Sequence, residues 1–246
     1  AVEIVDLYIF DESSSMNAFM NEEKRNLGIK TSAFEESFFA VHDAWHGTPR
    51  IMVAYDLMLS LPKLVGIGGL HHEVAHTVLH GSLEYYSFSM PTLLLKLEGD
   101  GVISRQMTRD ILYLASIAVK DFEVTRLLHE KGYVEDQVAY NKYFLEESEE
   151  EYQAWKIAEK NKTARLLVLV SFMKTYCCAA PLQKDERYGE EMAEMTARSI
   201  RFLPTELSAY VLKMLDASSE FGLNTHENVD LFMKKIIDEL IEGEIL

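Results

Sequence analysis

Cysteine is scarce in this chain. Among its 246 residues the only cysteines are Cys177 and Cys178, and adjacent cysteines bridge poorly because a disulfide demands a particular separation and dihedral angle. A small secreted domain would typically carry a framework of several disulfides. The scarcity therefore excludes a disulfide-stapled fold, and it predicts a protein of the reducing cytoplasm.

Long apolar runs are also missing. The longest of them, such as residues 166–173, fall far short of the roughly 20 residues that a transmembrane helix needs. The first residues, Ala1–Val2–Glu3, do not open a charged segment followed by an apolar core, so we expect no secretion signal. The sequence predicts a protein with no membrane partner.

Positive charge is in short supply as well. The 24 lysines and arginines stand against 40 aspartates and glutamates, which gives a formal net charge of −16. Nucleic acid and anionic lipid surfaces would repel such a protein, so we expect neither as a partner. The charge is compatible with basic substrates, although such a charge more often serves only solubility.

What remains is an ordinary globular composition, with 48% hydrophobic and 26% charged residues. Loose alternation over residues 2–10 predicts a strand, and a polar turn is expected at residues 11–15. Two further strands are predicted at residues 37–41 and 50–55, whereas almost everything after residue 57 has helical periodicity.

A small sheet followed by helices is an α+β arrangement. The length suffices for one large domain with a helical extension. We predict a first region over residues 1–145, in which a small N-terminal sheet accompanies several helices. A mainly helical region over residues 146–246 is expected to pack on it.

The most informative segment is His72–Glu73–Val74–Ala75–His76. Residues four apart share one face of a helix, so His72 and His76 can bind one metal ion from the same side. Glu73 then lies beside the open coordination position, where it can accept a proton from a zinc-bound water. The alternative is a core helix with packed histidines, but an unpaired carboxylate is costly in such a core.

The setting of this segment supports the metal-binding interpretation. An apolar, β-branched strand at residues 51–55 comes before it. An approach containing Gly66, Gly68 and Gly69 follows, and the histidine helix is expected to end at Gly81. Strand, glycine-containing approach and His-Glu helix form the context that the motif requires.

Two histidines leave a zinc site one protein ligand short. Ser82 stands where one family of zinc enzymes has a third histidine, so a carboxylate from a later helix is the better candidate. Asp121 belongs to an apolar stripe, where a buried acid needs a partner such as a metal ion. Glu123 lies near Lys120 and Arg126, where an exposed salt bridge would account for it. We favour Asp121 as the third ligand and keep Glu123 as the alternative.

Two other histidines are not expected to bind the ion. His71 points off the metal-binding face, and His80 lies too far from His72 on a continuous helix to share one ion. His80 is expected to support a ligand or to pack. Thr125, one turn after Asp121, is a candidate to hydrogen-bond a ligand.

These segments resemble the zincin metallopeptidases, which pair a His-Glu-x-x-His helix with a later Glu-x-x-Ala-Asn/Asp helix. The trailing Leu-His-Gly of residues 79–81 is similar to that of ImmA/IrrE-like zincins. In this comparison the family's carboxylate falls on Asp121, its Ala on Val124 and its Asn or Asp on Thr125. The resemblance covers about residues 50–128, and it implies that residues 1–145 form a zincin-like metal-binding domain.

The resemblance implies a zinc-dependent metallopeptidase or amide hydrolase that acts on a peptide or protein substrate. One Zn²⁺ on His72, His76 and Asp121 would lower the pKa of its bound water, and Glu73 would accept that proton and pass it to the leaving amine. An extended substrate is expected to pair along the strand at residues 51–55. The alternative is a non-catalytic zincin-like metal-binding or regulatory module. The same ligands also suit iron, cobalt or manganese.

Overall fold

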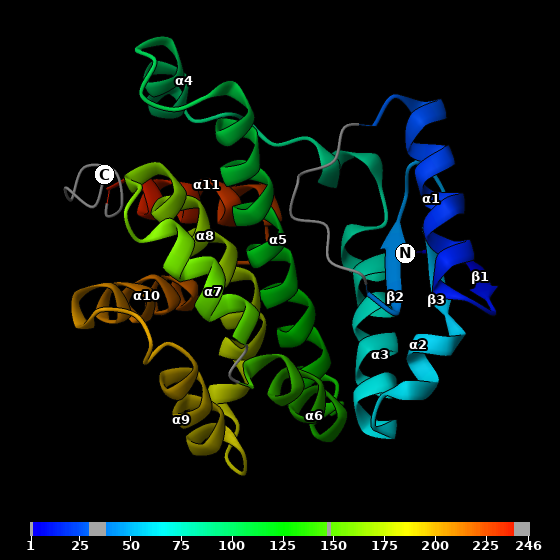
Figure 1. The fold of residues 1–246 in the computed structure, drawn as a ribbon. Helices are drawn as coiled ribbons and strands as arrows, with labels where there is room; N and C mark the ends of the chain where they lie inside the picture. The colour runs from blue at the N-terminus through cyan, green and yellow to red at the C-terminus, as the bar shows by residue number, and fades with distance from the viewer. Residues whose placement is uncertain (1, 30–37, 147–148, 239–246) are drawn as a thin grey trace.

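The computed structural model describes residues 2–29, 38–146 and 149–238, and it has the predicted α+β architecture, with a small sheet first and helices after it (Figure 1). The strands are β1 (Asp6–Phe10), β2 (Ala40–Asp43) and β3 (Arg50–Ala54). The α-helices are α1 (Ser13–Leu27), α2 (Tyr55–Ser60), α3 (Lys63–His80), α4 (Thr92–Gly99), α5 (Arg105–Glu130), α6 (Val134–Leu145), α7 (Glu149–Ala158), α8 (Lys162–Ala179), α9 (Gly189–Ser199), α10 (Thr205–Ala217) and α11 (Thr225–Ile236). The 3₁₀ helices are η1 (Leu83–Tyr86), η2 (Ala180–Lys184) and η3 (Ser218–Glu220).

The sheet has the order β1-β3-β2, with β1 parallel and β2 antiparallel to β3. Because β3 is hydrogen-bonded on both sides, it cannot accept another strand. The expectation that a substrate pairs along residues 51–55 is therefore wrong. In the described part of the sheet, β1 and β2 are the edge strands. Ser37, the first residue of the predicted second strand, lies outside the described residues.

A helix stands where the sequence predicts only a polar turn at residues 11–15. Helix α1 carries Met16, Phe19 and Met20 at helical spacing, and these side chains belong to a core cluster with residues of the sheet. The helix is polar on average, so its short apolar stripe is a weak signal in the sequence. Packing of this stripe against the apolar residues of the sheet stabilises the helix.

A buried arginine links the N-terminal helix α1 to the sheet. Arg50, at the start of β3, is 3% exposed. Its Nε donates to Asp43 Oδ1 at 2.8 Å, and its Nη1 donates to Glu23 Oε1 at 2.9 Å. A buried charge is tolerated when its hydrogen bonds are satisfied by opposite charges, as here. The network joins α1, β2 and β3.

Helix α3 contains the predicted metal-binding segment and ends at His80, so the predicted stop before Gly81 is confirmed. The glycine-containing approach is not a separate segment, because the helix already begins at Lys63. Gly68 permits close packing against α6, since a Cβ on it would overlap the Asp136 carbonyl oxygen and lie 2.8 Å from Tyr140 Cβ. Gly68 is thus a packing residue inside the helix.

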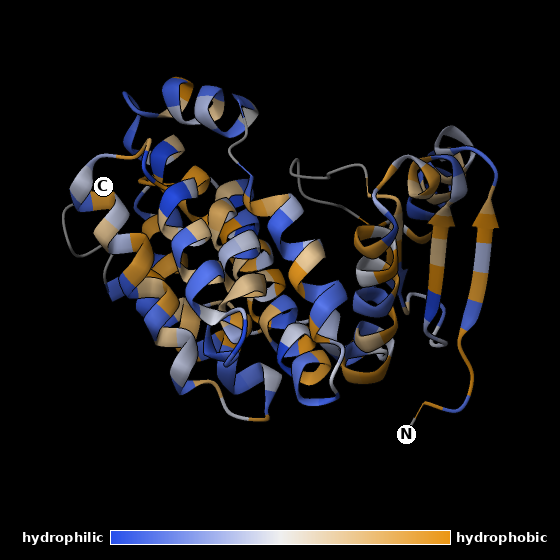
Figure 2. Ribbon diagram, turned by 90° about the horizontal axis from the view of Figure 1, so that it is seen from below, coloured by the Kyte–Doolittle hydropathy of each residue, from blue (hydrophilic) through white to orange (hydrophobic). Residues whose placement is uncertain are grey.

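Helix α3 lies between the sheet and the group of helices that includes α5 and α6 (Figures 1 and 2). A small core that includes Phe39, Val53 and Tyr140 joins the sheet to α3 and α6. The largest core runs from Leu94 to Ile237, and within it α5 packs along α8. This core includes residues from both sides of the boundary predicted at residue 145. The division of the chain at that residue stays a prediction.

One helical stretch among the described residues, Lys162–Lys184, is long and apolar enough to cross a membrane by length and composition alone. The stretch includes α8, and 61% of its apolar window is buried within the protein. Its apolar side chains, such as Leu166 and Val170, belong to the large helical core. Packing in that core accounts for its composition.

The close approach of α3 to α6 makes Gly68 a stability determinant. We expect Gly68→Ala to lower the free energy of unfolding by about 1–3 kcal/mol, because the methyl group must displace the backbone at Asp136. Chemical denaturation measures this. Gly99→Ala is the control, since a Cβ there meets nothing within 4 Å, and its effect should stay within about 1 kcal/mol. Equal stability of both variants would contradict the assigned contact.

Candidate metal centre

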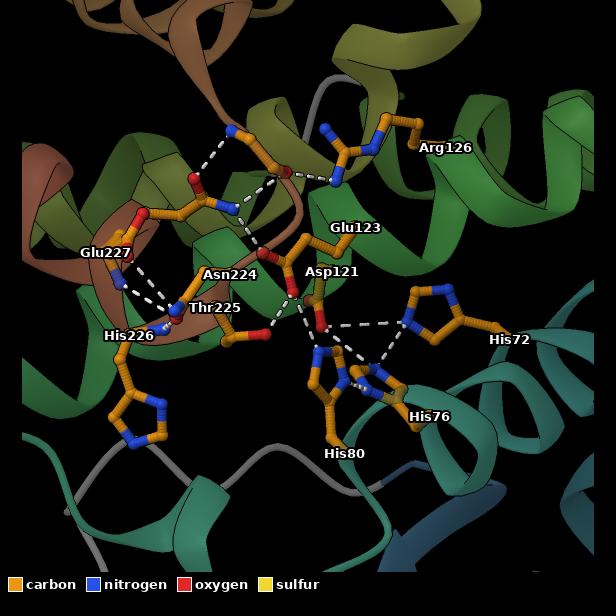
Figure 3. Close-up of polar contacts among 12 residues, drawn as sticks. His72, His76, His80, Asp121, Glu123, Arg126, Asn224, Thr225, His226 and Glu227 are labelled. Carbon is orange, nitrogen blue, oxygen red and sulfur yellow. Dashed lines mark hydrogen bonds and ion pairs between the residues drawn. The ribbon is translucent and has the colours of Figure 1, made fainter. Parts of the chain in front are cut away.

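Three side chains converge between α3 and α5 (Figure 3). His72 and His76 come from successive turns of α3, and Asp121 comes from α5. His76 Nε2 lies 3.1 Å from His72 Nε2 and 3.1 Å from Asp121 Oδ1, and His72 Nε2 lies 3.6 Å from the same oxygen. The structure thus brings together the three residues that the sequence proposes as ligands.

The distances suit a small divalent cation. Ligands at about 2.0–2.1 Å from a tetrahedral zinc ion lie roughly 3.3–3.4 Å from one another. The three observed separations, 3.1, 3.1 and 3.6 Å, lie on either side of that value. The side chains of His72, His76 and Asp121 are also buried, so the group is shielded from bulk water. The residues present therefore fit a bound metal ion.

The charge states of Asp121 and His76 also suit a metal ion, whereas that of His72 does not. Burial raises the pKa of Asp121, but His72 and His76 outweigh that effect and hold it well below its usual range. Burial lowers the pKa of His76 well below its usual value, so this ring is neutral. Burial also lowers the pKa of His72, but Cys178 and Asp121 together raise it well above normal. A metal ion would therefore have to displace a proton from His72.

Glu73 lies on the same helix and contacts a residue that the sequence did not single out. Glu73 Oε2 lies 3.0 Å from Nδ1 of His42, which belongs to β2. The His42 ring stacks on the His76 ring with centroids 4.2 Å apart and an interplanar angle of 8°. Nothing in the local pattern around His42 indicates this role, because the contact depends on how β2 packs against α3.

The alternative ligand, Glu123, has a different environment from the one expected. The exposed salt bridge with Lys120 or Arg126 is wrong: Glu123 is 5% exposed, and Arg126 instead donates to the carbonyl oxygens of Phe221 and Gly222. The reason is long-range, because the segment that leads into α11 and its first turn cover this face of α5. No local pattern around Glu123 shows that cover.

The carboxylate of Glu123 is turned toward His80 and α11. Glu123 Oε2 lies 2.9 Å from His80 Nε2 and accepts a hydrogen bond from Thr225 Oγ1 at 2.8 Å. Glu123 Oε1 accepts from Asn228 Nδ2 at 2.5 Å. Asp121 is consequently the acid whose oxygen faces His72 and His76, as Figure 3 shows.

The remaining candidates lie around this group. Thr125 Oγ1 lies 3.3 Å from Cys178 Sγ, so this hydroxyl contacts a thiol. His71 points away from the group and hydrogen-bonds Asp136. His80 Nδ1 lies 3.1 Å from His76 Nδ1, so it contacts the ring nitrogen of His76 that does not face Asp121.

Comparison with known proteins adds nothing to this geometry. No family model, curated protein or solved structure matches the chain. The assignment of a function therefore depends on the side chains of the site and on their chemistry.

The buried histidines predict a pH dependence of stability for the metal-free protein. Burial lowers the pKa of His80 from 6.5 to about 4, so between these values the unfolded chain binds a proton that the folded chain does not. The contribution of a neutral His80 to stability is fully present above about pH 6.5 and decreases as the pH falls toward 4. For His80 alone the loss between pH 7 and pH 5 is about 2 kcal/mol.

Urea denaturation with excess chelator at the two pH values measures this loss. His80→Asn should show a smaller pH dependence than the wild type. The control His46→Asn, at a ring whose side chain is 51% exposed, should retain the wild-type dependence. A His80→Asn variant that keeps the full wild-type pH dependence would contradict the burial of a neutral His80.

Proposed function

We propose that this chain is a zinc-dependent hydrolase of the zincin type, acting as a peptidase or amide hydrolase. The observation that carries the proposal is the convergence of His72, His76 and Asp121 beside a helix that also presents Glu73. Two imidazoles and one carboxylate are the protein ligands of many catalytic zinc sites, which keep a fourth position for water or substrate. The ligands also suit other divalent transition metals, and zinc is the proposed ion.

The residues divide the work of hydrolysis among them. A bound zinc ion supplies Lewis-acid polarisation and a water of lowered pKa. Glu73 accepts a proton from the attacking water and passes it to the leaving amine. His42 hydrogen-bonds Glu73 Oε2 at 3.0 Å and so fixes the orientation of that carboxylate. Stacking of His42 on His76 holds the base and a metal ligand in one rigid group.

The proposed substrate is a peptide or protein. The net charge of −16 argues against nucleic acid and is compatible with basic substrates. We place the protein in the cytoplasm on the strength of its two unpaired, buried cysteines, which suit a reducing compartment.

A second candidate function is a non-catalytic metal-binding or regulatory module. The observation that favours it is the burial of the ligands: His72, His76 and Asp121 are 3%, 4% and 6% exposed. A catalytic ion needs an open position that a substrate can reach, whereas a structural ion is enclosed by protein. The two candidates share the metal and differ in access to it.

The metal site predicts binding of one zinc ion per chain. We expect Asp121→Asn to weaken zinc binding by more than about 100-fold, because it removes a charged ligand. Mutation of a residue that only hydrogen-bonds a ligand typically lowers metal affinity by roughly 10–100-fold. Asp110→Asn is the matched control, since Asp110 is also a buried acid on α5 but hydrogen-bonds Gln106. Competition with a chromophoric chelator measures both affinities. Equal zinc binding by the two variants would contradict the assignment of Asp121.

The hydrolytic role predicts a specific defect for Glu73→Gln. This variant should bind zinc as the wild type does but cleave a peptide library roughly 10²–10⁴-fold more slowly, because it lacks the general base. Mass spectrometry of the digested library measures cleavage. Glu84→Gln, at an exposed position just beyond α3, should cleave normally. Wild-type protein that holds zinc tightly and cleaves nothing would favour the non-catalytic module.

A further inference from the structure

A chain of polar contacts runs from the proposed metal ligands to the C-terminal helix (Figure 3). It starts at His76, whose two ring nitrogens are both in contact: Nε2 with His72 and Asp121, and Nδ1 with His80 Nδ1 at 3.1 Å. His80 Nε2 lies 2.9 Å from Glu123 Oε2. The chain of contacts is therefore His76, His80 and Glu123, all buried.

The protons of this chain can be placed by elimination. A nitrogen that binds a metal carries no proton, so a neutral His76 bound through Nε2 has its proton on Nδ1. That proton can be donated only if His80 Nδ1 accepts it. The single proton of a neutral His80 then lies on Nε2 and points at the Glu123 carboxylate. One arrangement satisfies both contacts, and it is the arrangement that leaves His76 Nε2 ready for a metal ion.

Helix α11 fixes the far end of the chain. Thr225 and Asn228, in its first turn, donate to the two oxygens of Glu123 at 2.8 and 2.5 Å. The side chain of Asn224 caps this helix by accepting from the backbone nitrogens of His226 and Glu227. The positive end of a helix dipole stabilises a carboxylate placed beside it. Glu123 is thus held from a segment that lies 102 to 105 residues further along the chain.

The other imidazole ligand has no such support. His72 Nδ1 is buried, and no nitrogen or oxygen atom of the described residues hydrogen-bonds it. The nearby Cys178 thiol raises the pKa of this ring. The two histidines of the site therefore differ in how their rings are oriented. His76 is oriented by His80 and, through it, by Glu123. His72 is oriented mainly by packing.

We propose that His80 and Glu123, seated by the first turn of α11, are positioning residues that fix the tautomer and orientation of His76 and thereby set the affinity of the site for its metal ion. This rests on the proposed function, because it assumes that His76 binds the ion. Residues that hold a metal-binding histidine from behind are typically worth 10–100-fold in metal affinity. The proposal also makes metal affinity depend on the docking of α11, which lies outside the metal-binding segments themselves.

The test is the zinc dissociation constant of the full-length chain, measured by chelator competition. Glu123→Gln and His80→Leu should each weaken zinc binding by roughly 10–100-fold. His80→Asn should recover part of the loss, because its Oδ1 can accept the His76 proton where Nδ1 did. Thr225→Val, which removes only the hydroxyl that clamps Glu123, should give a smaller loss in the same direction. Circular dichroism checks that each variant is folded.

The matched control is Glu130→Gln, which makes the same chemical change as Glu123→Gln at an exposed position of the same helix, α5. Its zinc affinity should equal that of the wild type. A second measurement reports the tautomer directly: long-range ¹H–¹⁵N correlation spectra of the zinc-bound protein should show the His80 proton on Nε2.

The outcomes separate this proposal from the function on which it rests. Wild-type protein that binds no zinc would overturn both. Wild-type protein that binds zinc, with the same affinity retained in folded Glu123→Gln and His80→Leu, would overturn the positioning role alone. A His80 proton found on Nδ1 would also overturn it, whereas the graded losses described above would support it.

Discussion

The burial of a polar seam between α3 and α5 is the constraint around which this molecule is organised. Three histidines of α3, at positions 72, 76 and 80, face two acids of α5, Asp121 and Glu123, and all five residues are at most 6% exposed. Polar groups removed from water are costly unless they find partners. Each acid meets that requirement through the histidines: Asp121 with His72 and His76, and Glu123 with His80. A cation between His72, His76 and Asp121 would complete the pairing.

The rest of the fold closes this seam from two directions. On one side the sheet contributes His42, which stacks on a histidine of the seam and holds Glu73. On the other side the first turn of α11 covers Glu123. The glycines of α3 allow α6 to pack closely against the helix that carries the histidines. A site built in this way combines a short local motif with contributions from the N-terminal sheet and the C-terminal helix.

The same burial bears on function in two ways. A dry environment strengthens the electrostatic interactions that a hydrolytic site uses, and it also suits an enclosed structural ion. The pairing of Glu73 with His42 favours the hydrolytic interpretation, because a carboxylate placed next to the ligands and held by a second residue is arranged as a general base. Access of a substrate to the ligands is what distinguishes the two proposed functions.

The sequence by itself determined the parts of this protein that depend on local periodicity. Spacing along one helix placed His72, Glu73 and His76 together, the apolar stripe of α5 identified Asp121 as an acid facing inward, and the order of strands and helices gave the α+β class. Only the tertiary structure decided that Glu123 is buried against α11, that His42 meets Glu73, that β3 lies at the centre of the sheet and that α1 is a helix. Those features depend on which segments pack together over long distances in the chain, and no local pattern specifies the partner that a segment will meet.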